Sequence, residues 1–214
     1  MSFFLALSIA GLYFLTNQLS WNRPALLPLF ELEKQIPLMP WTMWIYLTLY
    51  LYMAAVFYQI ESVFLFNRMA WALLFMQVFS ACIFVFYPVI YPRELFPYDT
   101  SASFSSWAFQ WIQYFDRPTN CLPSLHVSNT LLLNFAFLHE KRQRLGFHSV
   151  WGGLVILSTL TTKQHYIYDV VLGISSAIFF YCLFFKTRLI EVEEVFEYKE
   201  NLVSNDQIDY DQAS

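Results

Sequence analysis

Two short polar stretches, Asn120-Cys121-Leu122-Pro123-Ser124-Leu125-His126 and Lys163-Gln164-His165-Tyr166-Ile167-Tyr168-Asp169, interrupt long apolar segments of this chain. We call them the first and the second polar island. Ionisable side chains at the boundary of a membrane are costly unless they pair, face water or take part in chemistry. We therefore interpret the rest of the chain as a scaffold that brings the two islands together.

The composition around the islands is typical of a membrane protein. Of 214 residues, 57% are hydrophobic, 21% are aromatic and only 13% are charged, whereas about a quarter of a soluble domain is charged. The net charge of −4 says little about partners, because much of the acid lies after Ile190. No basic stripe or nucleic-acid motif is present, so we expect membrane lipids and no nucleic acid as partners.

A spanning helix needs about 20 mostly apolar residues, and the charge-free segments predict an all-α, polytopic membrane protein with about six transmembrane helices in a single bundle. The expected spans are 2–20, 41–60, 69–91, 123–138, 147–162 and 166–185. The first lacks the basic start and cleavage site of a signal peptide, so we interpret it as a retained helix. Residues 1–190 form one expected domain, and residues 191–214 an acidic tail.

The basic residues predict the orientation, because short cytoplasmic loops are enriched in Lys and Arg. With six spans, one side carries Arg68, the cluster at 141–144, Lys186 and Arg188. The other side carries Arg23, Lys34, Arg93, Arg117 and Lys163. The denser clusters favour the first side as cytoplasmic. Both termini would then be cytoplasmic, and both islands would face the opposite compartment, in a bacterial inner membrane or a eukaryotic membrane.

The second island carries a histidine and a carboxylate four residues apart, His165 and Asp169. On a helix this spacing places both on one face. The carboxylate would then hold one imidazole nitrogen and leave the other as an oriented nucleophile or base. The alternative is a structural pair that satisfies itself at a helix end.

The first island has the features of a helix start. Pro123 suits the first turn, Asn120 is a candidate cap, and the amides around Ser124 and Leu125 would form an anion site. His126, in the same turn, would donate a proton to a leaving group. The alternative for this histidine is a satisfied interfacial residue.

An oxyanion also needs fixed positive charge, and three basic residues lie on the side of the islands. Arg93, Arg117 and Lys163 are the candidates, since arginine matches phosphate bidentately and lysine acts as a point charge. Each is alternatively a snorkelling anchor. No metal-binding spacing such as C-x-x-C occurs among the three cysteines, so we expect neither metal nor cofactor.

The islands together resemble the type-2 phosphatidic acid phosphatase superfamily. The resemblance rests on Ser124-Leu125-His126 followed by Gln164-His165-Tyr166-x-x-Asp169 and Gly173, and it is closest to the inositol-phosphorylceramide and sphingomyelin synthase-like branch. It covers roughly residues 30 to 185. The resemblance implies that His165 forms a phospho-histidine, that Asp169 orients it, and that His126 serves the leaving group and then the acceptor.

The chain also departs from the pattern of that family. Typical members carry Ser-Arg six or seven residues before the nucleophile, where this chain has Ser158-Thr159, and Lys163 is the candidate to replace that charge. The upstream basic motif is represented by Arg93, whereas Arg117-Pro118 lies unusually close to the first island.

We expect a membrane enzyme that hydrolyses a phosphorylated or diphosphorylated lipid without a metal. The first alternative is a phosphotransferase with a lipid or sugar hydroxyl as acceptor. The second is a small transporter that uses the same ionisable residues as a path, which their position at one interface disfavours. A purely structural membrane partner would leave the islands unexplained. We also expect His126 and His165 to converge in one pocket.

Overall fold

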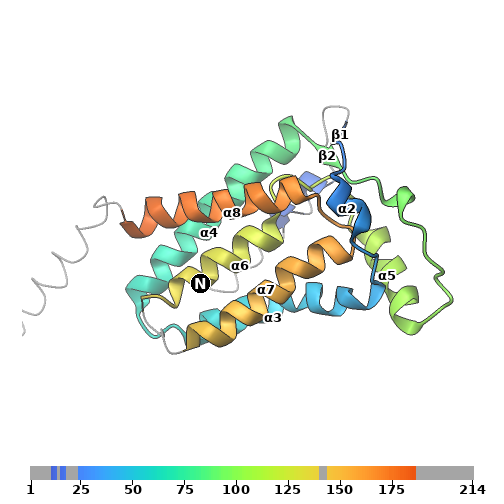
Figure 1. The fold of residues 1–214 in the computed structure, drawn as a ribbon. Helices are drawn as coiled ribbons and strands as arrows, with labels where there is room; N and C mark the ends of the chain where they lie inside the picture. Colours follow the sequence, from blue (N-terminus) through green and yellow to red (C-terminus); the bar gives the residue numbers. More distant parts are fainter. Residues whose placement is uncertain (1–10, 14, 18–23, 140–143, 187–214) are drawn as a thin grey trace, which may run out of the picture.

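The computed structural model describes residues 11–13, 15–17, 24–139 and 144–186. Within these residues, five helices lie side by side as a bundle (Figure 1): α3 (Met43–Gln59), α4 (Val63–Phe86), α6 (Leu125–Ala136), α7 (Leu145–Thr161) and α8 (Ile167–Tyr181). A π-helical segment, Cys182–Lys186, extends α8. The described chain is mostly helical, as the sequence predicts.

Helix α6 lies at the centre of the bundle and packs against α3, α4, α7 and α8. It has only 12 residues, too few to cross a bilayer of about 30 Å, which needs about 20. The helices around it bury most of its side chains, so α6 has little surface left for lipid. Its Leu132 and Leu133 join the main apolar core with residues of α3, α4 and α8.

Among the residues that the structure describes, three helices are long and apolar enough to cross a membrane: Pro40–Gln59, Val63–Phe86 and Ile167–Lys186. Leu145–Thr161 is a shorter apolar helix. The predicted number of about six spans is therefore not confirmed. Most of the first expected span lies outside the described residues, although residues 11–13 and 15–17 are helical. The tail 191–214 also lies outside them.

The third expected span is displaced: α4 begins and ends earlier than the range 69–91. It begins at Val63 because Ser62 caps it, its hydroxyl accepting a hydrogen bond from the Leu65 amide. Arg68 lies within the helix, with its guanidinium carbon 4.4 Å from the centre of the Phe64 ring. The helix ends at Phe86, shortly before Pro88, which cannot continue a helix.

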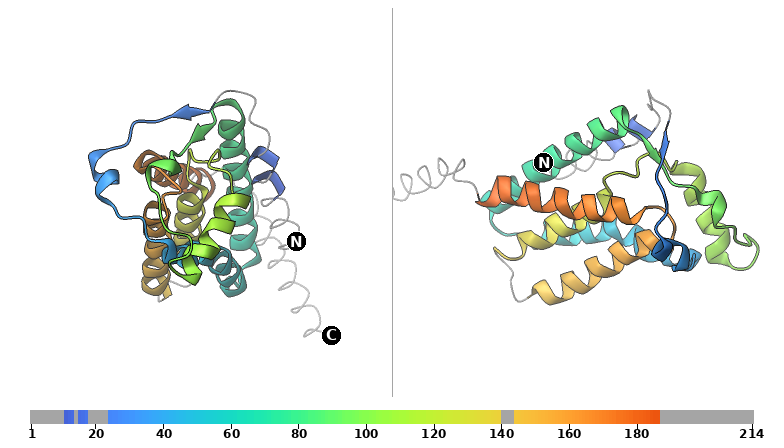
Figure 2. Two further views of the ribbon diagram at one scale, coloured as in Figure 1. Left: turned by 90° about the vertical axis from the view of Figure 1, so that its right-hand side faces the viewer. Right: turned by 45° about the horizontal axis from the view of Figure 1, so that its top comes forward.

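Short elements cover one end of the bundle (Figures 1 and 2): β1 (Ala25–Leu26), α2 (Glu31–Gln35), the 3-10 turn η1 (Pro40–Thr42), β2 (Val89–Ile90), the 3-10 turn η2 (Arg93–Leu95) and α5 (Phe104–Phe115). Strands β1 and β2 pair in parallel, Ala25 with Val89 and Leu26 with Ile90. Neither α2 nor α5 is predicted above, because both segments lie between the expected spans.

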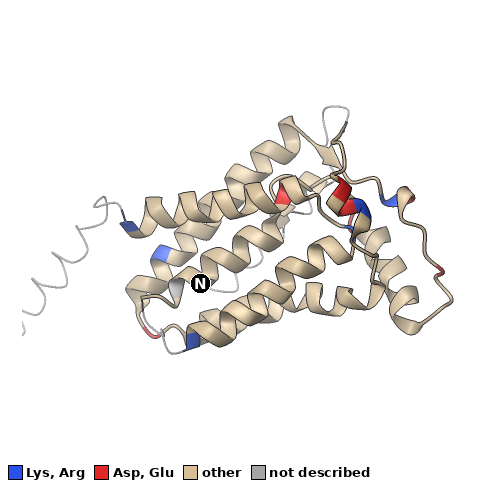
Figure 3. Ribbon diagram, in the orientation of Figure 1, with Lys and Arg blue, Asp and Glu red and all other residues tan. Residues whose placement is uncertain are grey.

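Charged residues gather at the two ends of the bundle, and its middle is almost free of them (Figure 3). One end carries Arg68, Arg144 and Lys186 and the other carries Asp169 with α2 and η2, as the order of the helices requires. This pattern fits a membrane protein. Which end is cytoplasmic stays a prediction, and residues 141–143 of the basic cluster lie outside the described part.

Candidate active site

The second island forms the connection between α7 and α8. His165 Nδ1 lies 3.2 Å from Asp169 Oδ2 and 3.0 Å from the carbonyl oxygen of Cys121. Because both neighbours are acceptors, Nδ1 carries a proton, and in the neutral ring Nε2 then keeps its lone pair. The predicted pair is present, but its geometry differs: His165 precedes the helix, whose N-cap is Tyr166, and Asp169 lies in the first turn.

Asp169 is fully buried and held from two directions. Its Oδ2 atom also accepts a hydrogen bond of 2.8 Å from the Tyr166 amide, as part of a capping box at the start of α8. The positive end of a helix dipole stabilises a carboxylate at this position. Its orientation toward His165 therefore follows from the way the chain starts α8.

His126 lies in the first turn of α6, and its ring stacks on Tyr46 of α3 with centroids 3.8 Å apart. Its Nε2 atom is buried and has no hydrogen-bond partner among the described residues. The ring centroids of His126 and His165 are 6.1 Å apart. The prediction that the two histidines converge is confirmed, and a buried polar atom without a partner is the feature expected of a group that awaits a ligand.

The start of α6 differs from the prediction in three details. The helix begins at Leu125 and not at Pro123, and the Ser124 hydroxyl caps it by accepting a hydrogen bond from the Val127 amide. The Ser124 amide donates to the carbonyl oxygen of Asp169 at 3.1 Å, so it joins the islands and is not a free anion donor. Asn120 does not cap; its side chain donates to the N-terminal segment, at Tyr13 O and Thr16 Oγ1.

Arg93 reaches the second island from η2. Its Nη2 donates to the side-chain oxygen of Gln164, next to His165, and its Nη1 donates to the Asp116 carbonyl oxygen at 2.8 Å. Its Nε atom is buried without a partner among the described residues. The guanidinium therefore contacts the residue next to His165 and keeps its Nε–H without a partner among the described residues.

Arg117 and Lys163 are placed differently from Arg93. Arg117 is exposed, and its hydrogen bonds to Asn17 come from its backbone. The Lys163 ammonium donates to the Glu33 carbonyl oxygen at 2.6 Å and lies 4.2 Å from the centre of the Phe96 ring. Burial lowers the pKa of Lys163, and the nearby Glu33 opposes that shift. These contacts favour a structural position for both, and their phosphate-binding roles stay predictions.

Two carboxylates at this end were missed by the sequence analysis. Glu33 of α2 is buried; its Oε1 accepts from the Ile167 amide and its Oε2 from the Phe30 amide, both at 2.6 Å. It therefore caps α8 from a segment 134 residues away, a contact that no local pattern indicates. Asp116, at the end of α5, accepts a hydrogen bond of 2.6 Å from the Tyr13 hydroxyl. Burial raises the pKa of Asp116, and Tyr13, Arg93 and His165 oppose that shift.

Cys121, His165 and Asp169 offer ligand atoms that all lie within 4.8 Å of one another, the one group of this kind among the described residues. Three of the atoms are already used in hydrogen bonds, since Cys121 Sγ donates to the Pro118 carbonyl oxygen at 3.1 Å and His165 Nδ1 pairs with Asp169 Oδ2; Asp169 Oδ1 has no partner among the described residues. Burial also raises the pKa of the Cys121 thiol, which opposes the thiolate that a metal needs. The donor set fits a hydrogen-bond network better than a metal centre.

Fold and site together define a helical, membrane-type protein with a buried histidine pair at one end of its bundle. Residues 16–183 match the family model of the PAP2 superfamily. The match covers most of the chain and both polar islands, and the chain belongs to this superfamily. No curated protein and no solved structure matches the chain. The family match does not distinguish the sphingomyelin synthase-like branch from the others.

Proposed function

We propose that this protein is a membrane-embedded lipid phosphatase that hydrolyses a phosphorylated or diphosphorylated lipid through phospho-His165. The observation that carries the proposal is the histidine pair: centroids 6.1 Å apart, with His165 Nδ1 held by Asp169. Membership of the PAP2 superfamily supports phosphoryl-transfer chemistry of the phosphatase or phosphotransferase kind.

In the first step, the lone pair on His165 Nε2 forms a bond to phosphorus, and the bond from phosphorus to the lipid oxygen breaks. His126 donates a proton to that leaving oxygen. In the second step, His126 takes a proton from water, the water oxygen bonds to phosphorus, and the P–N bond breaks to release phosphate. The free N–H of Arg93 would bind a phosphate oxygen, since guanidinium groups match phosphate geometry.

The second candidate function is transfer of the phospho-head group to a lipid or sugar hydroxyl. It is favoured by the sequence Gln164-His165-Tyr166-x-x-Asp169, whose pattern resembles the synthase-like branch. The residues and the first step stay the same. In the second step a hydroxyl takes the place of water, and His126 activates it.

A screen of lipid phosphates with the purified protein tests both candidates. We expect phosphate release from at least one lipid monophosphate or diphosphate without an added acceptor, and none from His165→Ala purified in parallel. Product that forms only with an added alcohol, without phosphate release, would contradict the phosphatase and support the phosphotransferase. No turnover of any lipid phosphate under either condition would contradict both.

A further inference from the structure

Helix α5 carries an aromatic stripe on one face. Residues three or four positions apart share a face of a helix. The stripe has this spacing, with Phe115 four residues after Trp111, and consists of Phe104, Trp107, Trp111, Tyr114 and Phe115. Their exposed fractions range from 49% to 74%, whereas Ser106 and Phe109 on the opposite face are buried. Contiguous exposed apolar surface of this kind marks an interaction site.

The stripe carries no charge, because α5 contains no Asp, Glu, Lys or Arg in its 12 residues. Trp and Tyr are the residues that concentrate where a membrane meets water. An amphipathic helix with such a face lies in the plane of the interface, with its apolar side buried to a depth of about 5–10 Å. The chemistry of the stripe therefore matches lipid at the level of the headgroups.

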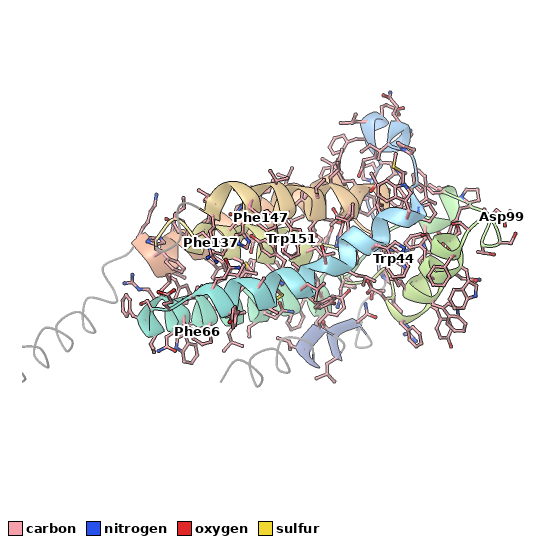
Figure 4. The ribbon with its side chains drawn as sticks, turned by 90° about the horizontal axis from the view of Figure 1, so that it is seen from below. Trp44, Phe66, Asp99, Phe137, Phe147 and Trp151 are labelled. Carbon is pink, nitrogen blue, oxygen red and sulfur yellow. The ribbon has the colours of Figure 1, made fainter. Side chains whose placement is uncertain are left out.

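The position of α5 matches the same depth. The helix runs across the end of the bundle and not along it (Figures 1 and 2). It packs on η1, where the candidate span Pro40–Gln59 begins. The indole N–H of Trp44 donates to the Ser105 hydroxyl at 3.0 Å, and the Trp44 ring stacks on Phe104. Figure 4 shows Trp44 beside α5, with Asp99 at the tip of the preceding loop.

The stripe is also continuous with the outer surface of a span. Trp41 and Trp44, at the start of that span, are exposed by 55% and 45%. Only 33% of the most apolar stretch of that span is buried inside the protein, so the rest of the stretch would face lipid in a bilayer. The lipid that covers α3 would therefore also reach the stripe.

We propose that the aromatic stripe of α5 docks into the interfacial layer of the lipid bilayer, on the side of the membrane that carries the polar islands. This surface goes beyond the proposed reaction. It also fixes the depth of the site, because the C-terminal carbonyls of α5 and its cap, Gln113 and Asp116, accept hydrogen bonds from Arg93. An α5 held at the headgroups places Arg93 at the level of lipid phosphates.

Spin labels on single cysteines, read out in phosphatidylcholine vesicles, test the proposal. Cysteine is placed at Trp111, at Tyr114 or at Ala102 in a chain with Cys82 and Cys182 replaced by alanine, while the buried Cys121 is kept. Ala102 is the control, because it is exposed on the loop before α5. We expect labels at 111 and 114 to be relaxed by oxygen and protected from a water-soluble nickel chelate, and the label at 102 to show the reverse.

Two results would overturn the proposal. Labels at both stripe positions that are as accessible to the nickel chelate as the label at 102 would place the stripe in water. Strong spin–spin broadening at 111 and 114, lost on dilution with unlabelled protein, would mean that a second copy of the chain covers the stripe. Two stripe positions are used so that one misfolded variant does not decide the outcome.

Discussion

At the residue scale, Arg93 is the candidate to bind the phosphate, because its guanidinium donates to Gln164 and its Nε–H has no partner among the described residues. Replacing Arg93 by Lys keeps one charge but loses the fork that binds phosphate bidentately. We expect kcat/KM for the lipid phosphate to fall about 10- to 100-fold, which corresponds to about 1.4–2.7 kcal/mol of transition-state binding. Steady-state kinetics on purified protein measures this.

The matched control is Arg117→Lys, because Arg117 is exposed and makes its hydrogen bonds to Asn17 through its backbone. We expect its kcat/KM to stay within about twofold of the parent. An Arg93→Lys protein that loses no more activity than Arg117→Lys would show that position 93 needs only a positive charge, and the specific role of the Arg93 guanidinium would be wrong.

Sequence reasoning at this scale was accurate where the partners are close along the chain. The contact of His165 with Asp169 spans four residues, so spacing alone indicates it. The contact of the Lys163 ammonium with the Glu33 carbonyl oxygen, 130 residues away, has no such local signal, and the phosphate-binding role of Lys163 stays a prediction. A positive φ of 53° at Lys163 directs the chain through the turn, and no motif in the sequence indicates that conformation.

At the scale of elements, the distance between the histidines depends on how closely α8 approaches the start of α6. A Cβ atom on Gly173 would lie 2.8 Å from the Ser124 carbonyl oxygen and 3.0 Å from Val127 Cβ. The first of these atoms is backbone and has little room to move. Gly173→Ala should therefore destabilise the protein by about 1–3 kcal/mol and reduce kcat, because His126 lies in the turn that must shift.

Gly153→Ala is the control for that variant, since a Cβ there meets nothing within 4 Å. Alanine in place of glycine in a helix should leave the free energy of unfolding unchanged or raise it by up to about 1 kcal/mol. The thermal midpoint should therefore stay the same or rise. Thermal unfolding in detergent and turnover are measured on both variants. A Gly173→Ala protein that matches Gly153→Ala in both readouts would contradict the close approach of α6 and α8.

Helix α2 holds the start of α8 through Glu33, whose two carboxylate oxygens accept from the Ile167 and Phe30 amides. Glu33→Gln replaces one acceptor oxygen by a donor and removes the charge. We expect a loss of about 1.5–3 kcal/mol, the usual contribution of a hydrogen bond to a charged group. The thermal midpoint of Glu33→Gln should fall, while Glu31→Gln, whose side chain is 82% exposed, should not change it.

If Glu33→Gln unfolds no earlier than Glu31→Gln, the cap contributes nothing to stability.

Element prediction was weakest at this end of the molecule. Helix α5 carries a recognisable cap, Ser103, and apolar residues at helical spacing, so a closer reading of the pattern would have found it. The five-residue α2 offers no such signal, because its structure depends on contacts with α8.

At the scale of the whole molecule, the predicted helical bundle is present, the number of about six spans is not confirmed, and the third span begins and ends earlier than predicted. Hydropathy treats each segment alone, so it does not show that α6, with only 12 residues, is surrounded by α3, α4, α7 and α8. The islands meet at one end of the bundle (Figure 3). The opposite end carries Arg68, Arg144 and Lys186. This meeting of the two islands was predictable, because each island stands at the start of an expected span, 123–138 or 166–185, and both spans start on the same side of the membrane.

The predicted orientation places the islands away from the cytoplasm. Cysteine at Ala102, which is exposed and lies outside the Ser103 cap, should react with an impermeant thiol reagent in sealed cells. The background chain lacks Cys82 and Cys182. Labelling that requires permeabilised cells would reverse the orientation and assign the substrate to the cytoplasmic leaflet.

The central claim is that the two islands form one phosphoryl-transfer site with His165 as the nucleophile. The most direct test is acid-labile, base-stable phosphate bound to the protein after a rapid quench with a lipid phosphate substrate. We expect this label in the parent protein and none in His165→Ala. With a substrate whose leaving group needs no proton, His126→Ala should accumulate the label, because water is no longer activated. Label or turnover that survives in His165→Ala would contradict the covalent mechanism.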